Sequence, residues 1–152
     1  MTITVVEPTQ WEDAPWMVPA LGELGQREVP GAGDNPRIVE YQTSCVAASH
    51  AQALGDESPW CSAYANWCMD RAGIRGSGRL NARSWLTWGT PLDVPHMGCI
   101  VVFSRPPKPA QGHVAFYVGE TDDAILCLGG NQGNAVSIKP YPKTRLIGYR
   151  RV

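Results

Sequence analysis

One of the five cysteines stands where the start of a helix would activate its thiol. A helix is predicted to run to Arg71, with Ser58 as its N-cap and Pro59 at its first position. Cys61 would then be the third helical residue, where free backbone amides and the positive end of the helix dipole stabilise an anion. Such a site favours the nucleophilic thiolate and can bind an oxyanion beside it. We therefore predict a nucleophile here, with a buried structural thiol as the alternative.

A nucleophilic cysteine needs a base, and His113 is the best candidate. It opens the alternating segment HVAFYVG, on the face opposite Val114, Phe116 and Val118, and a hairpin centred near residue 122 places Asn131 directly across from it. Asn131 could then orient the imidazole, unless a bulge shifts the register by one residue. The alternative is a half-buried strand histidine without a catalytic role.

The elements that must position these residues change character along the chain. Helices are predicted over residues 16–24, 37–48, 59–71 and 82–88, and short strands over 99–103, 113–119, 124–128, 135–138 and 146–150. Helices followed by strands predict an α+β fold, with N-terminal helices packed on a C-terminal antiparallel sheet of about five strands. We expect an N-terminal arm at residues 1–14 and a single domain over residues 15–152.

Composition excludes several other classes of protein. The 152 residues suit one domain, and 43% hydrophobic residues with a net charge of −1 do not suit a disordered chain. This charge gives no reason to expect nucleic acid or an anionic membrane as partner. No apolar run is long enough for membrane insertion, and the start of the chain lacks a secretory signal. We therefore expect synthesis in the cytoplasm, with free thiols.

A cysteine near a helix start, a histidine opening a strand and an asparagine after the next strand follow one another along the chain. Motifs in this order resemble those of the papain-like CHAP amidohydrolase/peptidase superfamily and its NlpC-like relatives among small phage and bacterial proteins. The resemblance spans nearly the whole chain beyond the arm. The stretches that carry it include PWCSAYANWCMDRAGI at 59–74, ARSWLTWG at 82–89, GCIVVFSR at 98–105, GHVAFYVGE at 112–120 and LGGNQGNAVSI at 128–138.

The resemblance implies a papain-like fold and hydrolysis of an amide bond in peptidoglycan by Cys61, His113 and Asn131, without a metal or organic cofactor. Either an N-acetylmuramoyl-L-alanine amidase or a stem or cross-bridge endopeptidase fits. Because aromatic rings stack on sugars and arginine pairs with carboxylates, further residues are candidates for binding substrate. These candidates are Trp60, Asn81, Arg83, Trp85, Trp88 and Gln132.

A wall hydrolase without a signal peptide must reach the cell wall in the periplasm after release or delivery. As a phage endolysin it would depend on a holin, and as an antibacterial effector on a secretion apparatus and a cognate immunity protein. We expect a monomer. Three alternatives stay open: a transamidase or deamidase acting on protein, a catalytically silent binding module of the same fold, and a metal site built from Cys61, Cys68 and His113.

Overall fold

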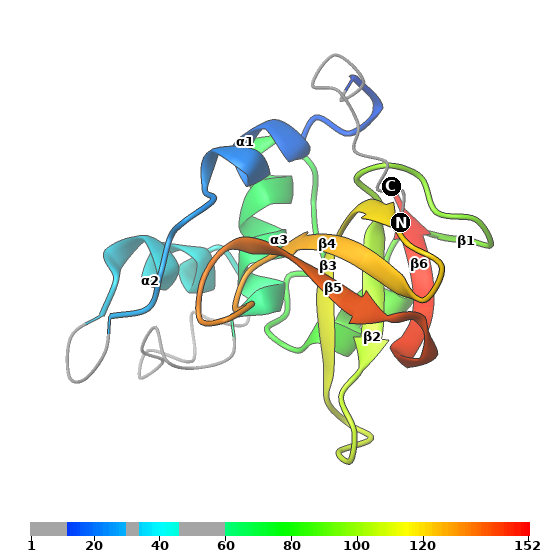
Figure 1. The fold of residues 1–152 in the computed structure, drawn as a ribbon. Helices are drawn as coiled ribbons and strands as arrows, with labels where there is room; N and C mark the ends of the chain where they lie inside the picture. Colours follow the sequence, from blue (N-terminus) through cyan, green and yellow to red (C-terminus); the bar gives the residue numbers. More distant parts are fainter. Residues whose placement is uncertain (1–11, 30–33, 46–59) are drawn as a thin grey trace.

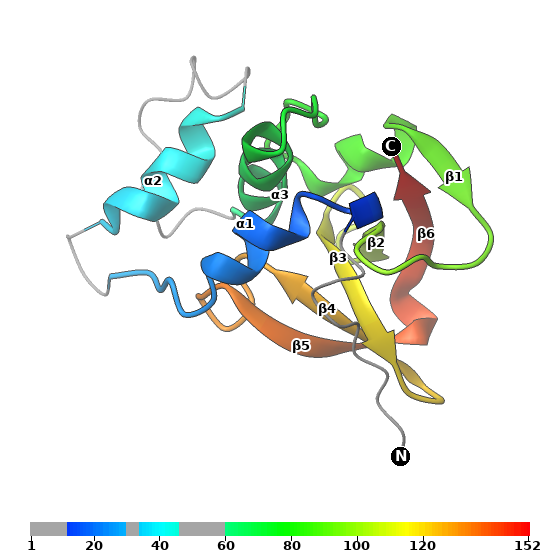
Figure 2. The same cartoon turned by 90° about the horizontal axis from the view of Figure 1, so that it is seen from above.

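The α-helices come first in the chain and gather beside a curved sheet (Figures 1 and 2). This computed structural model describes residues 12–29, 34–45 and 60–152, so most of the predicted arm lies outside the described residues. The helices are α1 (Met17–Gly22), α2 (Pro36–Thr43), α3 (Cys61–Arg71) and the short 3-10 helices η3 (Ala82–Thr87) and η4 (Lys143–Arg145).

All strand pairs of the sheet are antiparallel, in the order β1-β6-β2-β3-β4-β5. The predicted α+β fold class is confirmed, with six strands in place of about five. The additional strand, β1, has only three residues, too few for an alternating pattern to reveal it. The strands are β1 (Thr90–Leu92), β2 (Ile100–Ser104), β3 (Gly112–Glu120), β4 (Ala124–Gly129), β5 (Ser137–Pro142) and β6 (Leu146–Arg151).

Within the described ranges, no helix has the length and apolar character needed to cross a membrane.

Local signals explain where α2 begins but not where α3 begins. The Asn35 side chain accepts a hydrogen bond from the Arg37 amide at 2.9 Å, and Pro36 takes the first position of α2. The predicted capping residues of α3, Ser58 and Pro59, lie outside the described residues. Trp60 occupies the N-cap instead, with no side-chain capping bond. Cys61 is therefore the first residue of α3, and its predicted third position is wrong.

The two faces of the sheet carry two separate apolar clusters. Even-numbered residues of β2 and β3, such as Val102, Val114 and Phe116, pack with the helices. Odd-numbered residues, such as Phe103 and Ala115, pack with side chains of β4 and the partly buried residues of β5 and β6. This alternation confirms that His113 lies on the face opposite Val114 and Phe116.

The start of α3 packs directly against the chain that leaves β4. A Cβ atom added to Gly130 would lie 2.7 Å from the ring of Trp60 and 2.7 Å from Cβ of Tyr64. Both of those side chains are fully or almost fully buried, so they have little room to move. Only glycine lets the backbone at residue 130 approach these two side chains so closely.

This contact predicts that Gly130→Ala destabilises the protein by about 1–3 kcal/mol, the usual cost of overpacking a core. Urea unfolding measures the change. Gly22→Ala is the matched control, because an added Cβ there meets nothing within 4 Å, and its effect should stay within about 0.5 kcal/mol. Equal stability of the two variants would show that the contact is not tight.

Candidate active site

The Cys61 thiol lies among backbone amides at the first turn of α3. The first hydrogen bond of this turn runs from the Tyr64 amide to the Trp60 carbonyl, so the amides of residues 61–63 precede the helical ladder. The sulfur interacts with the N–H groups of Cys61, Ser62 and Val114. The predicted anion-stabilising surroundings are therefore present, although the helix begins later than predicted.

Two opposing effects act on this thiol. Cys61 is only 4% exposed, and burial raises the pKa of its thiol. The amides of Val114 and Ser62 and the charge of Arg105 act in the opposite direction. The net direction of the pKa is upward, so the thiolate that the helix start was predicted to favour is not the resting form, and the resting group is the thiol.

The sulfur reaches the Val114 amide because strand pairing stops just before it. The pairing of β3 with β4 ends at Phe116 and Leu128, and the first residues of β3 extend beyond it. In this stretch the Val114 N–H points to the Cys61 sulfur. The predicted nucleophile therefore lies beside the backbone of the residue that follows His113.

Gln132 makes the hydrogen bond to the His113 ring. Its Oε1 lies 2.9 Å from His113 Nε2, and its Nε2 donates to the carbonyls of Cys127 at 3.1 Å and Ser137 at 2.7 Å. Because both amide hydrogens are donated elsewhere, Oε1 must accept the imidazole proton. The network thus assigns the proton of neutral His113 to Nε2 and leaves Nδ1 free as a base.

The prediction that Asn131 forms a hydrogen bond with the His113 ring is therefore wrong, because Gln132 forms this bond. The predicted register does hold at this end of the hairpin, where Phe116 pairs with Leu128, and the bulge lies further along, between Tyr117 and Gly119. However, β4 ends at Gly129, and Asn131 adopts a left-handed φ of 58°. The strand geometry that would have placed Asn131 opposite His113 does not extend that far.

Glycine also brings Gln132 to the imidazole. A Cβ atom on Gly129 would lie 2.4 Å from Gln132 Oε1 and 2.9 Å from Cβ of Ala115. The side-chain amide therefore crosses directly over the Gly129 backbone to reach His113. This close approach explains why a glycine pair precedes Asn131 and Gln132 in the chain.

Aromatic rings enclose the imidazole from the side of the second cluster. The rings of His113 and Tyr141 stack with centroids 4.8 Å apart, and Phe103 stacks on Tyr141 at 5.0 Å. Burial is the main reason that the pKa of His113 falls to about 4, and the charge of Arg105 adds to the effect. The hydrogen bond that the ring donates to Gln132 Oε1 opposes the shift. His113 is therefore neutral at pH 7, as a general base must be.

A polar cavity of about 270 Å³ opens beside this ring. Asn131 lines it together with His113, so the structure brings Asn131 to the site without the predicted hydrogen bond. Sequence reasoning missed six other lining residues. Gly133 and Asn134 directly follow Gln132, whereas the other four come from distant segments with no shared motif: Arg105, Lys139, Tyr141 and Arg145.

Three of the residues predicted to bind substrate are buried. Trp60 and Trp85 are 0% exposed, and their indole N–H groups donate to Glu28 and Ser62. Gln132 is 2% exposed and serves His113. The substrate contacts predicted for the two tryptophans are wrong, because both rings fill the core.

The other predicted substrate residues lie away from the His113 cavity. Arg83 Nε donates to the Gln111 carbonyl at 2.9 Å and so supports the turn that leads to His113. Asn81 and Trp88 line a separate hollow of about 360 Å³ with Ser77 and Ser84. The structure does not bring these side chains together with the cavity beside His113.

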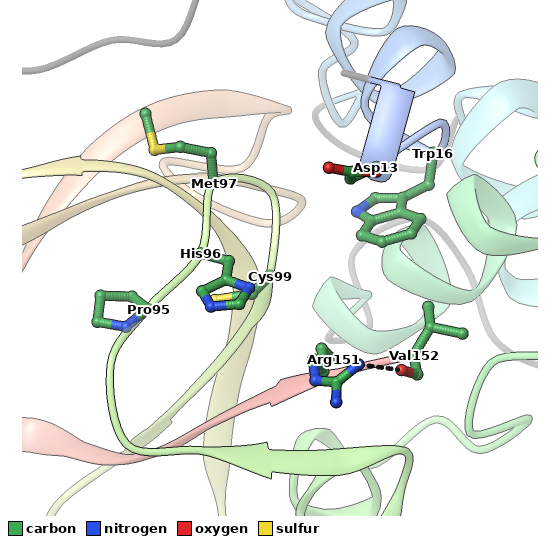
Figure 3. Close-up of a pocket in the computed structure, with 8 residues that line it drawn as sticks. All are labelled: Asp13, Trp16, Pro95, His96, Met97, Cys99, Arg151 and Val152. Carbon is green, nitrogen blue, oxygen red and sulfur yellow. Dashed lines mark hydrogen bonds between the residues drawn. The ribbon is translucent and has the colours of Figure 1, made fainter. Parts of the chain in front are cut away.

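A larger cavity of about 700 Å³ lies elsewhere, between the segment before α1, the β1–β2 connection and the end of β6 (Figure 3). Trp16 forms one wall, and its Nε1 donates to the Gly98 carbonyl at 2.8 Å. None of Cys61, His113 and Gln132 lines this cavity. Size alone therefore does not identify the reactive site.

The five thiols are all free and buried. Burial raises the pKa of Cys45 to about 11 and that of Cys99 to about 12. Among the described residues, no three His, Cys, Asp or Glu side chains gather as a metal site would require.

Comparison with known proteins gives a family match and structural neighbours. The family model described as "CHAP domain" matches residues 53–131, just over half of the chain. No curated protein matches the sequence.

Solved structures of similar fold share little sequence with this chain. An NLP/P60 family protein of Staphylococcus aureus aligns over 100% of this chain and 44% of its own, with 18% identity and a TM-score of 0.55. The P60 domain of a Mycobacterium avium paratuberculosis antigen aligns over 94% of both chains, with 17% identity and a TM-score of 0.55. The peptidoglycan hydrolase RipB of Mycobacterium tuberculosis aligns over 96% of this chain and 68% of its own, with 16% identity and a TM-score of 0.54.

These likenesses establish a shared fold, and the chain spans less than half the length of the Staphylococcus aureus protein.

The hydrogen-bond network predicts that Gln132→Glu raises the pKa of His113 by more than about one unit, because a carboxylate would replace the amide oxygen on Nε2. Asn131→Asp, the matched control, adds the same charge in the same cavity without a hydrogen bond to the ring and should raise the pKa less. Titration of the imidazole by NMR measures both. A larger shift in the Asn131→Asp variant would return the orienting role to Asn131.

Burial of His113 also predicts a pH-dependent stability. Between its ordinary pKa of 6.5 and the folded value of about 4, the unfolded chain binds more protons than the folded one. The free energy of unfolding should therefore fall as the pH drops through this range, by at most roughly 3 kcal/mol. Urea unfolding of the wild type and His113→Gln across this range isolates the effect. The same pH dependence in both proteins would contradict it.

Proposed function

The chain belongs to the CHAP domain family, and from this premise we propose that it is a cysteine amidohydrolase that cleaves an amide bond of peptidoglycan. The observation that carries the proposal is the environment of Cys61. Its thiol lies at the first turn of α3 among backbone N–H groups, one of which belongs to Val114, the residue that follows the buried His113 in β3. The ring of His113 is oriented by Gln132. The fold shared with the peptidoglycan hydrolase RipB adds support.

In the first step, the Cys61 sulfur attacks the carbonyl carbon of the substrate amide. The thiol proton passes to the free Nδ1 of His113, and the carbonyl π electrons move to oxygen. The N–H groups at the start of α3 that lie against the sulfur are placed to stabilise this oxyanion. Proton transfer during attack is required because burial disfavours a resting thiolate.

In the second step, the carbon–nitrogen bond breaks and the leaving amine takes the proton from His113. A thioester on Cys61 remains. Water then attacks the thioester carbonyl and gives a proton to His113, which returns it to the departing sulfur. Gln132 acts as a positioning residue throughout, because its Oε1 holds the Nε2–H and so keeps Nδ1 available.

We further propose two candidates for the bond that is cleaved and two for the biological setting of the reaction. The bond is that of an N-acetylmuramoyl-L-alanine amidase or of a stem or cross-bridge endopeptidase. The setting is phage lysis or delivery as an antibacterial effector. Mass spectrometry of the released muropeptides identifies the bond, because the two activities place the new amine on different fragments.

We expect Cys61→Ala and His113→Ala each to lower the rate of amine release from purified peptidoglycan by at least about a thousandfold. Cys45→Ala is the matched control, since Cys45 is another buried thiol but lies near the end of α2. It should keep most of the activity. Melting temperatures of all three variants show whether each protein is folded.

Full activity of a folded Cys61→Ala variant would overturn the proposed mechanism. Transfer of the acyl group to an added amine, with no hydrolysis of peptidoglycan, would instead favour the transamidase alternative. Absence of both reactions, with slow and equal labelling of all five thiols, would favour a silent binding module.

A further inference from the structure

The cavity beside His113 holds an unusual concentration of positive charge. Arg105 follows β2, Lys139 lies on β5 and Arg145 ends η4, yet all three line the same space. The charges of these three residues all act on the His113 imidazole. Among the residues that the structure describes, no carboxylate lines the cavity. A chain with a net charge of −1 thus concentrates three cations at one point.

These cations have no acidic partner among the described residues. The ion pairs there use Glu23, Glu40 and Glu120, and the cation paired with Glu120 is Lys143, outside the cavity. Arg145 donates its Nε to the Ser104 carbonyl at 2.9 Å, and its guanidinium carbon lies 5.6 Å from the centre of the Tyr141 ring. Its two terminal nitrogens have no hydrogen bond within the described part of the chain.

The loop after β4 adds neutral polar groups to the same cavity. Asn131 and Asn134 both line it, and both adopt φ of 58°, a conformation that costs energy in any residue other than glycine. Such strain often accompanies a functional site. The side-chain amides of Asn131 and Asn134, which can donate hydrogen bonds, thus line the same cavity as the three cations.

We propose that this cavity binds a free carboxylate of the substrate, close to the amide bond that is cleaved, and that the enzyme thereby selects peptides whose carboxylate is not converted to a carboxamide. The inference rests on the proposed function, because it assigns a substrate group to the same site. His113 lines the cavity, so a carboxylate bound there lies beside the proposed base. Arginine and lysine are the side chains suited to such a group.

Binding of a carboxylate would also assist the base. The three cations hold down the pKa of His113, although burial contributes more. A bound anion offsets their charge and makes the imidazole a stronger base at the moment when substrate is present. A carboxamide at the same position cannot do this, because it carries no charge.

The test compares muropeptides whose stem carboxylates are free with the same muropeptides carrying carboxamides. For the free form, we expect Arg105→Gln or Lys139→Gln each to raise KM about fivefold, and the double variant at least about twentyfold. For the carboxamide form, the wild type should already show the higher KM, and the variants should change it little. Lys139→Arg should restore the wild-type value, because it keeps the charge.

Lys108→Gln is the matched control. Lys108 is exposed and close to Arg105 in the chain but does not line the cavity, so this change removes one positive charge that should not contact the carboxylate. It should leave both substrates unaffected. Circular dichroism confirms that each variant is folded. Equal KM values of the wild type for the two forms, or equal effects of the variants on both, would overturn the proposal.

Binding to Cys61→Ala, measured by isothermal titration calorimetry, separates this inference from the proposed function. Tighter binding of the free-carboxylate form supports the cavity assignment even if the wild type releases no amine. Failure of the wild type to release amine would overturn only the proposed hydrolysis. Equal binding of the two forms overturns the cavity assignment whether or not the wild type hydrolyses peptidoglycan.

Discussion

The close packing of α3 against the chain around the β3–β4 pair is the constraint on which the rest of the site depends. Gly130 lets the backbone after β4 press against Trp60 and Tyr64, and Gly129 lets the Gln132 amide cross to His113. At the same junction, the Val114 N–H points to the Cys61 sulfur. The Cys61 thiol, the His113 ring and the orienting Gln132 amide therefore come from three segments that meet at this junction: α3, β3 and the loop after β4.

Burial at this junction determines the protonation states of the reacting groups. Removing Cys61 and His113 from water disfavours both the thiolate and the imidazolium, so the resting pair is neutral. The helix-start amides and the Gln132 oxygen act against this preference without reversing it. In the proposed mechanism, charges therefore form at this site only during the reaction, when the surrounding N–H groups would stabilise the oxyanion.

The charge of the molecule as a whole does not describe the charge at the site. Thirteen basic and fourteen acidic residues nearly cancel. The fold nevertheless brings Arg105, Lys139 and Arg145 to one cavity, while the described acidic partners in ion pairs lie elsewhere. The net charge gave no reason to expect nucleic acid or an anionic membrane as partner, and it equally gave no sign of a local cluster of cations.

Local patterns in the sequence were enough for much of this protein. Some features depend only on neighbouring residues: the capping of α2 by Asn35, the alternation along the strands and the change from helices to strands. The α+β class and the face of the sheet that carries His113 could therefore be predicted. Gln132 could not be chosen over Asn131, because that choice depends on β4 ending at Gly129 and on the left-handed turn beyond it. Likewise, the sequence does not distinguish a buried tryptophan from an exposed one, and only the packing shows that Trp60 and Trp85 belong to the core. The three cations are far apart in the chain, and only the folding of β2, β5 and η4 into one structure brings them to the cavity that His113 lines.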